Sequence, residues 1–550
     1  MKYLKAKAVS SLKKVMLTDN FYELTPLTSI KAAKGERVSF QIALKNTHSR
    51  KLYTYFKVCD EFKKFTHVAK VGYTPVRMPS YRDSDKNYLS LEPGLYPDVL
   101  YPIDENSRVV ADIDNTVCVW FTIDLPKTIK AGKHTISVEI TNEKDEEPGI
   151  ISIGLEVKKT VIAPTDLIYT QWFHCDCIAD YFGVPMMSKK HWTYIENFIK
   201  TAARTGINML LTPIFTPPLD TDIGGERPTM QLVKVAKQGD KYSFDFTLFD
   251  KWVKICHKHG IKYFEISHLF TQWGACFCPK IIVNVDGQDE MLFGWHVEST
   301  SKEYKDFLSQ FLPEFTAHIK NLGIADACYF HISDEPKMKE GKPDYDNFVK
   351  INEFITPLLS GFKKIDALSQ AEFYDSGLVQ IPIPCTNHIE PFLERDLPER
   401  WCYYCCSQYK DVSNRFLAMS SARTRVIGAQ MFYYDMVGFL QWGYNFYYSE
   451  RSRYKMDPFQ SADGDNSWPA GDPFSVYPYE DGAIESIRSV VFYDALQDRM
   501  LLKALADKIG ADEAKALLLE MAGGTFTFSE YPMDAEFITN LHDKVLDILG

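Results

Sequence analysis

From Leu167 onward, short apolar runs alternate with helical patterns, and this alternation constrains the fold more than any other feature. Eight runs have the length and composition of strands, at residues 167–173, 207–211, 261–266, 327–332, 364–368, 381–385, 401–406 and 438–442. Helical patterns are seen around Trp192, from Phe249 to His259 and from Tyr304 to Leu322. The alternation predicts an α/β fold, a (β/α)8 TIM-like barrel, in which active sites lie at the carboxyl ends of the strands.

The first part of the chain has a different period. Apolar residues alternate with polar ones within 38–44, 117–125, 136–140 and 151–157, which predicts strands buried on one face and hence a β-sandwich. From Ala483 to the end, the sequence is rich in good helix formers. We therefore expect an N-terminal β-sandwich domain at 1–164, a catalytic barrel at 165–500 and a helical C-terminal extension at 501–550, packed on the barrel.

Charge and cysteine usage exclude several classes of protein. Lys and Arg number 62 against 73 Asp and Glu, giving a net charge of −11, whereas a nucleic-acid binder normally has a basic surplus. No apolar stretch approaches the roughly 18 residues that a membrane span needs. The 12 cysteines are scattered, and residues 1–20 lack the apolar core of a signal peptide. We expect a cytoplasmic protein with free thiols.

Metal and cofactor motifs are not apparent. The pairs Cys175/Cys177 and Cys276/Cys278 have one-residue spacing, unlike common zinc knuckles. The sequence has no Gly-x-Ser-x-Gly elbow and no glycine-rich phosphate loop. We expect neither a metal nor a cofactor.

The strongest local signal for chemistry is an acidic pair, Asp334 and Glu335, which follows the fourth predicted strand and precedes Pro336. Adjacent side chains of a regular strand point to opposite faces, so both carboxyls reach one substrate only if the backbone leaves extended geometry here. Crowded carboxyls have separated pKa values, so that one stays protonated while the other is ionised, as acid–base chemistry at a glycosidic bond requires. A solvated surface turn is the alternative.

Aromatic residues gather near other strand ends. The chain has 9 Trp, 31 Tyr and 36 Phe, most of which suit core packing. Five candidates for sugar platforms follow predicted strands or lie in long loops: Trp273, Trp295, Tyr403, Tyr404 and Trp442. The two long loops, at 212–242 and 269–300, follow strand ends and are expected to be functional.

Five segments together resemble glycoside hydrolase family 123: residues 211–221, 268–274, 292–295, 333–336 and 438–445. The resemblance extends over roughly residues 167–499, with a β-sandwich in front as in that family. It departs from the family pattern at His296, where an acid is expected after the Trp295 motif.

The resemblance implies a β-N-acetylgalactosaminidase that retains the anomeric configuration by substrate assistance, in which the 2-acetamido oxygen attacks C1 to give an oxazolinium ion. Asp334 would orient the acetamide, and Glu335 would protonate the leaving oxygen and then deprotonate water. Tyr403 or Tyr404 would donate to the acetamide oxygen. From their strand-end positions, further roles are expected for Trp273 and Trp442 as walls of the sugar site, and for His174, His268 and Asn445 as partners of hydroxyl groups.

Two other functions remain open from the residues alone. The same acid pair can serve a glycosidase acting on a sugar without an acetamide, and the aromatic strand ends can serve a non-catalytic carbohydrate-binding protein. In each case the partner is an oligosaccharide or glycoconjugate, with no nucleic acid and no membrane span. The sequence leaves the oligomeric state open.

Overall fold

The centre of the protein is an eight-stranded parallel sheet, in a computed structural model that describes residues 1–59, 61–337 and 343–550. Its strand order is β20-β19-β18-β15-β12-β11-β22-β21. The strands are β11 (Ile168–Gln171), β12 (Met209–Thr212), β15 (Tyr263–Ile266), β18 (Cys328–His331), β19 (Lys363–Leu368), β20 (Ile381–Pro384), β21 (Trp401–Tyr403) and β22 (Gly438–Gln441). A parallel bridge between Cys385 and Tyr403 joins the two edges, so the barrel is nearly closed.

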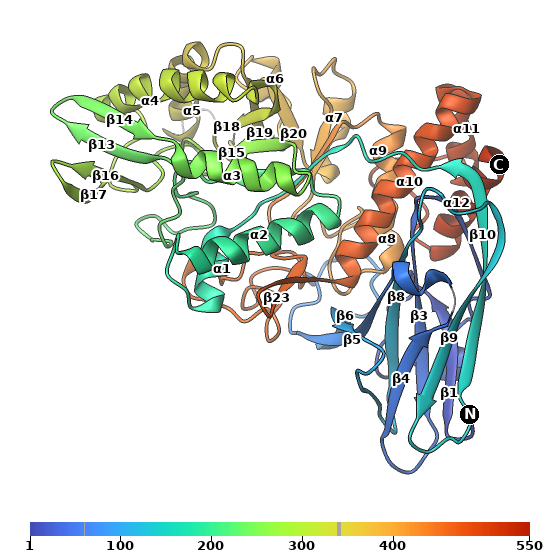
Figure 1. The fold of residues 1–550 in the computed structure, drawn as a ribbon. Helices are drawn as coiled ribbons and strands as arrows, with labels where there is room; N and C mark the ends of the chain where they lie inside the picture. The colour runs from blue at the N-terminus through green and yellow to red at the C-terminus, as the bar shows by residue number, and fades with distance from the viewer. Residues whose placement is uncertain (60, 338–342) are drawn as a thin grey trace.

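Helices surround these strands (Figure 1). They are α1 (Cys175–Phe182), α2 (Lys189–Arg204), α3 (Thr247–Lys258), α4 (Lys302–Asn321), α5 (Pro343–Leu358), α6 (Glu372–Asp375), α7 (Glu390–Leu393), α8 (Ser421–Arg425) and α9 (Ile427–Tyr433), with the short 3-10 turns η3 (Ala325–Ala327), η4 (Thr386–His388) and η5 (Glu450–Ser452). In α2, Ser188 caps the first turn and Trp192 and Ile199 are buried, as the helical period predicts.

Strand alternation divides the barrel residues between two cores. Leu211 and Leu440 belong to the cluster that fills the barrel interior, whereas Leu210 and Phe439 belong to the cluster that packs under the helices. This parity decides which strand residues can reach the mouth of the barrel.

The two long loops contain regular structure that the sequence did not predict. They carry a four-stranded sheet in the order β14-β13-β16-β17, formed by β13 (Lys234–Gln238), β14 (Lys241–Asp245), β16 (Ile281–Val285) and β17 (Gln288–Phe293). This sheet projects from the barrel on the side away from the N-terminal strands (Figure 1). Its strands are short and largely exposed, so they lack the apolar signal of core strands.

The N-terminal part consists of two five-stranded sheets, in the orders β1-β3-β8-β5-β6 and β2-β10-β9-β4-β7. The strands are β1 (Leu4–Ser10), β2 (Ser29–Lys34), β3 (Arg37–Asn46), β4 (Leu52–Val58), β5 (Thr66–Val76), β6 (Gly94–Ile103), β7 (Val109–Ala111), β8 (Thr116–Asp124), β9 (Gly132–Asn142) and β10 (Gly149–Val161), with the turns η1 (Phe21–Glu23) and η2 (Glu61–Phe65). Both sheets contribute to one buried cluster, in which Phe40 and Phe121 stack at 5.0 Å.

The chain ends in three helices, α10 (Ile487–Ile509), α11 (Ala511–Met521) and α12 (Ala535–Leu549), after the hairpin β23 (Val476–Tyr479) and β24 (Gly482–Glu485). The buried cluster of these helices also includes Leu12 and Ala33 of the N-terminal part. The expected domain boundary at 500 falls inside α10, and the division into domains stays a prediction. Among the described residues, no helix is long and apolar enough to cross a membrane.

Candidate active site

The acidic pair lies just beyond the carboxyl end of β18, which ends at His331. Glu335 has a φ of 45°, in the left-handed region that is rare for residues other than glycine. Its amide donates to the carbonyl of Ala367 on β19 at 3.0 Å. The backbone therefore leaves extended geometry at the pair, as the sequence required if both carboxyls are to face one ligand, and such strain gathers at functional sites.

Glu335 is held by a residue from the other edge of the barrel sheet. The Tyr403 hydroxyl, on β21, donates to Glu335 Oε1 at 2.8 Å. Burial and the nearby Glu335 charge raise the pKa of Tyr403 well above its usual value, so the phenol keeps its proton and remains a donor. The hydrogen bond fixes one carboxyl oxygen and leaves the other oxygen of Glu335 for a ligand.

Asp334 lies in a less polar environment, with only 9 % of its surface exposed. The Trp273 amide donates to its carbonyl oxygen at 2.9 Å, which fixes the backbone at this residue. Burial raises the pKa of Asp334 well above its usual value, and the negative charges of Glu335, Asp366 and Glu265 raise it further. The free site therefore favours the protonated form of Asp334, and an N–H donor or positive charge that a ligand brings beside this carboxyl shifts it toward the ionised form.

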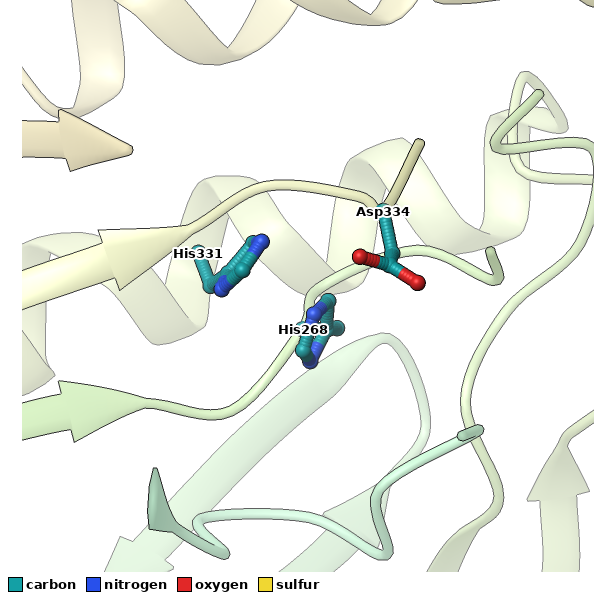
Figure 2. Close-up of side chains that lie close together, drawn as sticks. All are labelled: His268, His331 and Asp334. Atoms are coloured by element: carbon teal, nitrogen blue, oxygen red, sulfur yellow. The ribbon is translucent and has the colours of Figure 1, made fainter. Parts of the chain in front are cut away.

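Two histidines lie beside Asp334 (Figure 2). His331 Nδ1 is 2.8 Å from Glu265 Oε1, and because that carboxylate also accepts from Thr170 and Trp172, His331 carries its proton on Nδ1. His268 follows β15 and is 1 % exposed, and neither of its ring nitrogens has a hydrogen-bond partner. Burial and the neighbouring His331 lower the pKa of His268, so its ring is neutral.

These residues are also the ones that could hold a metal ion. One ligand atom each from His268, His331 and Asp334 lie within 4.8 Å of one another. The two imidazole rings, however, lie face to face, with centroids 4.0 Å apart and planes at 31°. A metal lies in the plane of each imidazole that binds it, so this stacked arrangement does not suit a common ion. The expectation of no metal stays a prediction.

Trp273 and Trp442 both lie at the barrel mouth. Trp273 has a φ of 61°, and 43 % of its surface is exposed. Trp442 packs against the cluster of the barrel interior that includes Tyr403 and Trp172, and its Nε1 donates to Asp472 Oδ2 at 2.8 Å. Both rings are therefore available as sugar platforms, one open and one fixed.

Other candidates have structural partners instead of free polar atoms. Asn445 uses Oδ1 and Nδ2 on the main chain of His174, at 2.8 and 3.0 Å. Both ring nitrogens of His174 are also engaged, with Arg227 at 3.1 Å and with the Trp442 carbonyl at 3.2 Å. These hydrogen bonds join the ends of the first and last barrel strands, and the expectation that the two residues bind hydroxyls stays a prediction.

Tyr404 and Trp295 do not join the pair. Tyr404 points away from the barrel interior, because it follows Tyr403 by one position, and packs on Phe439 at 4.9 Å. Trp295 lines a separate cavity of about 170 Å³ together with His296, and the residues lining it do not include Asp334 or Glu335. Of the two tyrosines left open by the sequence, Tyr403 contacts the pair, but its hydroxyl donates to Glu335, and the expected donation to the acetamide oxygen stays a prediction.

Sequence reasoning missed four polar or aromatic residues around the pair: Glu265, Asp366, Trp172 and Asp472. Glu265 and Asp366 each interrupt an apolar strand, in β15 and β19. Burying a charged side chain costs free energy, so a charged residue within an apolar strand indicates a functional site. The sequence shows this signal at both positions. Asp472 lies in a loop, where nothing in the sequence marks it.

Asp366 makes stability depend on pH. Burial raises the pKa of this carboxyl to about 7, an effect that His331 opposes. Because the unfolded value is about 3.9, the folded protein binds this proton more tightly, and the free energy of unfolding falls as pH rises from about 4 to 7. Asp366→Asn cannot titrate, so its melting temperature relative to wild type should be higher at pH 8 than at pH 5. A difference that does not change with pH would contradict this assignment.

A nearly closed parallel barrel with a carboxyl pair beyond one strand and aromatic residues beside it suits the hydrolysis of a glycosidic bond. A model of the glycoside hydrolase 123 catalytic domain matches residues 172–505. The chain belongs to glycoside hydrolase family 123, and its substrate is a carbohydrate.

A solved structure of a family member shares the fold. A family 123 glycoside hydrolase from Clostridium perfringens, described in work on glycolipid glycan hydrolysis, is similar over 99 % of this chain and 97 % of its own, with a TM-score of 0.72 and 16 % identity. A β-glucuronidase from Parabacteroides merdae is 10 % identical, covering 90 % of this chain and 51 % of its own, with a TM-score of 0.32. No curated protein matches the chain.

Proposed function

We propose that this hydrolase releases terminal β-linked N-acetylgalactosamine from a glycoconjugate, in an exo fashion, with retention of configuration by substrate assistance. The observation that carries the proposal is the placement of Asp334 and Glu335 as chain neighbours on a left-handed turn, with Glu335 bonded to Tyr403. Carboxyls so placed serve a substrate that brings its own nucleophile, because neither of them then has to attack the face of the sugar opposite the leaving group.

In the first step the acetamide oxygen attacks C1, and the bond from C1 to the leaving oxygen breaks. Glu335 gives its proton to that oxygen, with Tyr403 holding the other carboxyl oxygen in position. Asp334 accepts the acetamide N–H, and its buried carboxylate stabilises the positive charge of the oxazolinium ion.

In the second step water attacks C1 from the side that the leaving group vacated. Glu335, now ionised, takes the proton of that water, and the oxazolinium ring opens to restore the acetamide. The product keeps the β configuration because C1 is inverted twice. Trp273 and Trp442 form the walls of the sugar site, and His268, with two unpartnered ring nitrogens, binds a sugar hydroxyl.

The source of the substrate is part of the proposal. The similar Clostridium enzyme is described in connection with glycolipid glycans, which supports a glycoconjugate as the parent substrate here. The cysteines are free, which supports a cytoplasmic protein that acts on small glycan fragments. Cell fractionation tests this, and protein found outside the cell membrane would contradict it.

The experiment is a panel of aryl β-glycosides that share one leaving group. We expect hydrolysis of the N-acetylgalactosaminide, inhibition by the galactosamine-configured thiazoline that mimics the oxazolinium ion, and rates on the galactoside and glucoside lower by at least about a hundredfold, since they lack the nucleophile. Comparable rates on a sugar without the acetamide would instead favour the alternative function, a glycosidase whose substrate has no acetamide. Binding without turnover across the panel would favour a carbohydrate-binding protein.

A further inference from the structure

A segment of the N-terminal part reaches the mouth of the barrel. Residues 77–89, here called the strap, lie between the end of β5 at Val76 and the start of β6 at Gly94. The Ala470 amide donates to the Met78 carbonyl at 2.9 Å, and the Leu89 amide donates to the Ala418 carbonyl at 2.8 Å. Both ends of the strap are therefore tied to loops of the catalytic barrel.

Buried charges also hold the middle of the strap. The Asp85 carboxylate binds both terminal nitrogens of Arg423 at 3.0 Å, and Arg423 is fully buried. The Tyr409 hydroxyl donates to Asp83 at 2.9 Å, and the Tyr88 hydroxyl donates to the Tyr409 carbonyl at 2.6 Å. A bidentate pair and two side-chain hydrogen bonds give the strap a fixed position.

The strap brings Tyr81 against the loop that follows β21. Its ring meets the ring of Tyr409 edge-on, with centroids 4.7 Å apart. Burial raises the pKa of Tyr81, and the neighbouring Cys406, Asp472 and Cys405 raise it further. Tyr81 is only half-buried, so part of its ring faces outward.

The same loop positions the catalytic groups. Beside this loop, the Asp472 carboxylate accepts from the indole N–H of Trp442 at 2.8 Å. Tyr403, three residues before Cys406, holds Glu335. Tyr81 therefore lies beside the loop that follows Tyr403, the residue that holds the acid, and near Asp472, which holds a wall of the sugar site. Since Glu335 protonates the leaving oxygen, the leaving group departs on this side.

We propose that the strap forms a leaving-group subsite, in which the ring of Tyr81 packs against the second sugar of the substrate. This assignment rests on the proposed function, because it requires the leaving group to lie on the Glu335 side. It gives the N-terminal part a direct role in substrate choice: glycans with a sugar next to the cleaved bond are favoured over substrates without one.

The test compares a disaccharide with an inhibitor that has no leaving group. With Tyr81→Ala, kcat/KM for a disaccharide of β-linked N-acetylgalactosamine on galactose should fall about tenfold, the size of one lost aromatic contact. The Ki of the galactosamine-configured thiazoline, which fills only the cleaved-sugar site, should stay within about twofold. Tyr81→Phe, which keeps the ring, should retain most of the disaccharide activity.

The control is Tyr22→Ala, a substitution of an exposed tyrosine elsewhere in the N-terminal part, which should change neither value. If Tyr81→Ala weakens thiazoline binding as much as it slows disaccharide cleavage, or leaves both unchanged, the leaving-group subsite is wrong. If wild type neither cleaves the disaccharide nor binds the thiazoline, the proposed function itself fails, and the subsite with it.

Discussion

Glu335→Gln should lower kcat/KM for a glycan substrate by about a thousandfold, the usual range for loss of a general acid. Glutamine preserves the shape of the side chain and can still accept the Tyr403 hydroxyl, so the loss isolates the proton. A leaving group of low pKa needs little protonation, and the defect should therefore be much smaller on a dinitrophenyl glycoside. The measurement is kcat/KM for both substrates with the same enzyme preparations.

Asp334→Asn should behave differently. Because Asp334 acts on the acetamide and not on the leaving oxygen, its loss should cost about a hundredfold to a thousandfold on both substrates. The matched control is Glu399→Gln. Glu399 also accepts a tyrosine hydroxyl, from Tyr329 at 3.2 Å, but lies two residues before the start of β21, at the opposite end of the barrel. It should leave kcat/KM unchanged. If kcat/KM depends on the pKa of the leaving group equally in Glu335→Gln and Asp334→Asn, the assignment of the acid role to Glu335 alone is contradicted.

The second large effect concerns stability. Arg488→Met should lower the free energy of unfolding by about 3–5 kcal/mol, because it leaves a buried carboxylate without its counter-charge. Arg488, on α10, binds both oxygens of Asp98 on β6 at 2.9 and 2.8 Å and also donates to the carbonyls of Gly471 and Phe474. Urea unfolding measures the loss.

Two comparisons distinguish a buried pair from an ordinary one. Adding Asp98→Leu to Arg488→Met removes the stranded charge and should recover part of the lost stability. The exposed pair of Lys63 and Glu105, at 2.8 Å, should contribute less than about 1 kcal/mol when either partner is neutralised. If Arg488→Met costs no more than the surface substitution, the buried pair does not contribute the stability assigned to it.

Much of the fold could be predicted because buried strands and helices show a regular spacing of apolar residues in the sequence. All eight barrel strands lie within or beside the predicted runs, since parallel strands covered on both faces are almost continuously apolar. The strands β13 and β14 were not predicted because they are short and most of their residues are partly or fully exposed. Exposed hairpins lack this apolar pattern.

The sequence alone predicts the grouping of site residues only where they are neighbours along the chain. Asp334 and Glu335 are adjacent, so their pairing needs no tertiary information. The choice between Tyr403 and Tyr404 depends on the parity of β21 in the closed barrel, which the sequence does not state. The mutual hydrogen bonds of His174 and Asn445 join residues 271 positions apart, and only the fold shows that their polar atoms are already used.

The central claim is that the substrate supplies the nucleophile. The most direct test measures kcat/KM on aryl 2-acetamido-β-galactosides whose acetyl group carries none, one, two or three fluorine atoms. Each fluorine withdraws electrons from the acetamide oxygen, so substrate assistance predicts a steep, progressive fall along the series. Rates that stay level across the series would show that the acetamide does not attack C1, and would contradict the account.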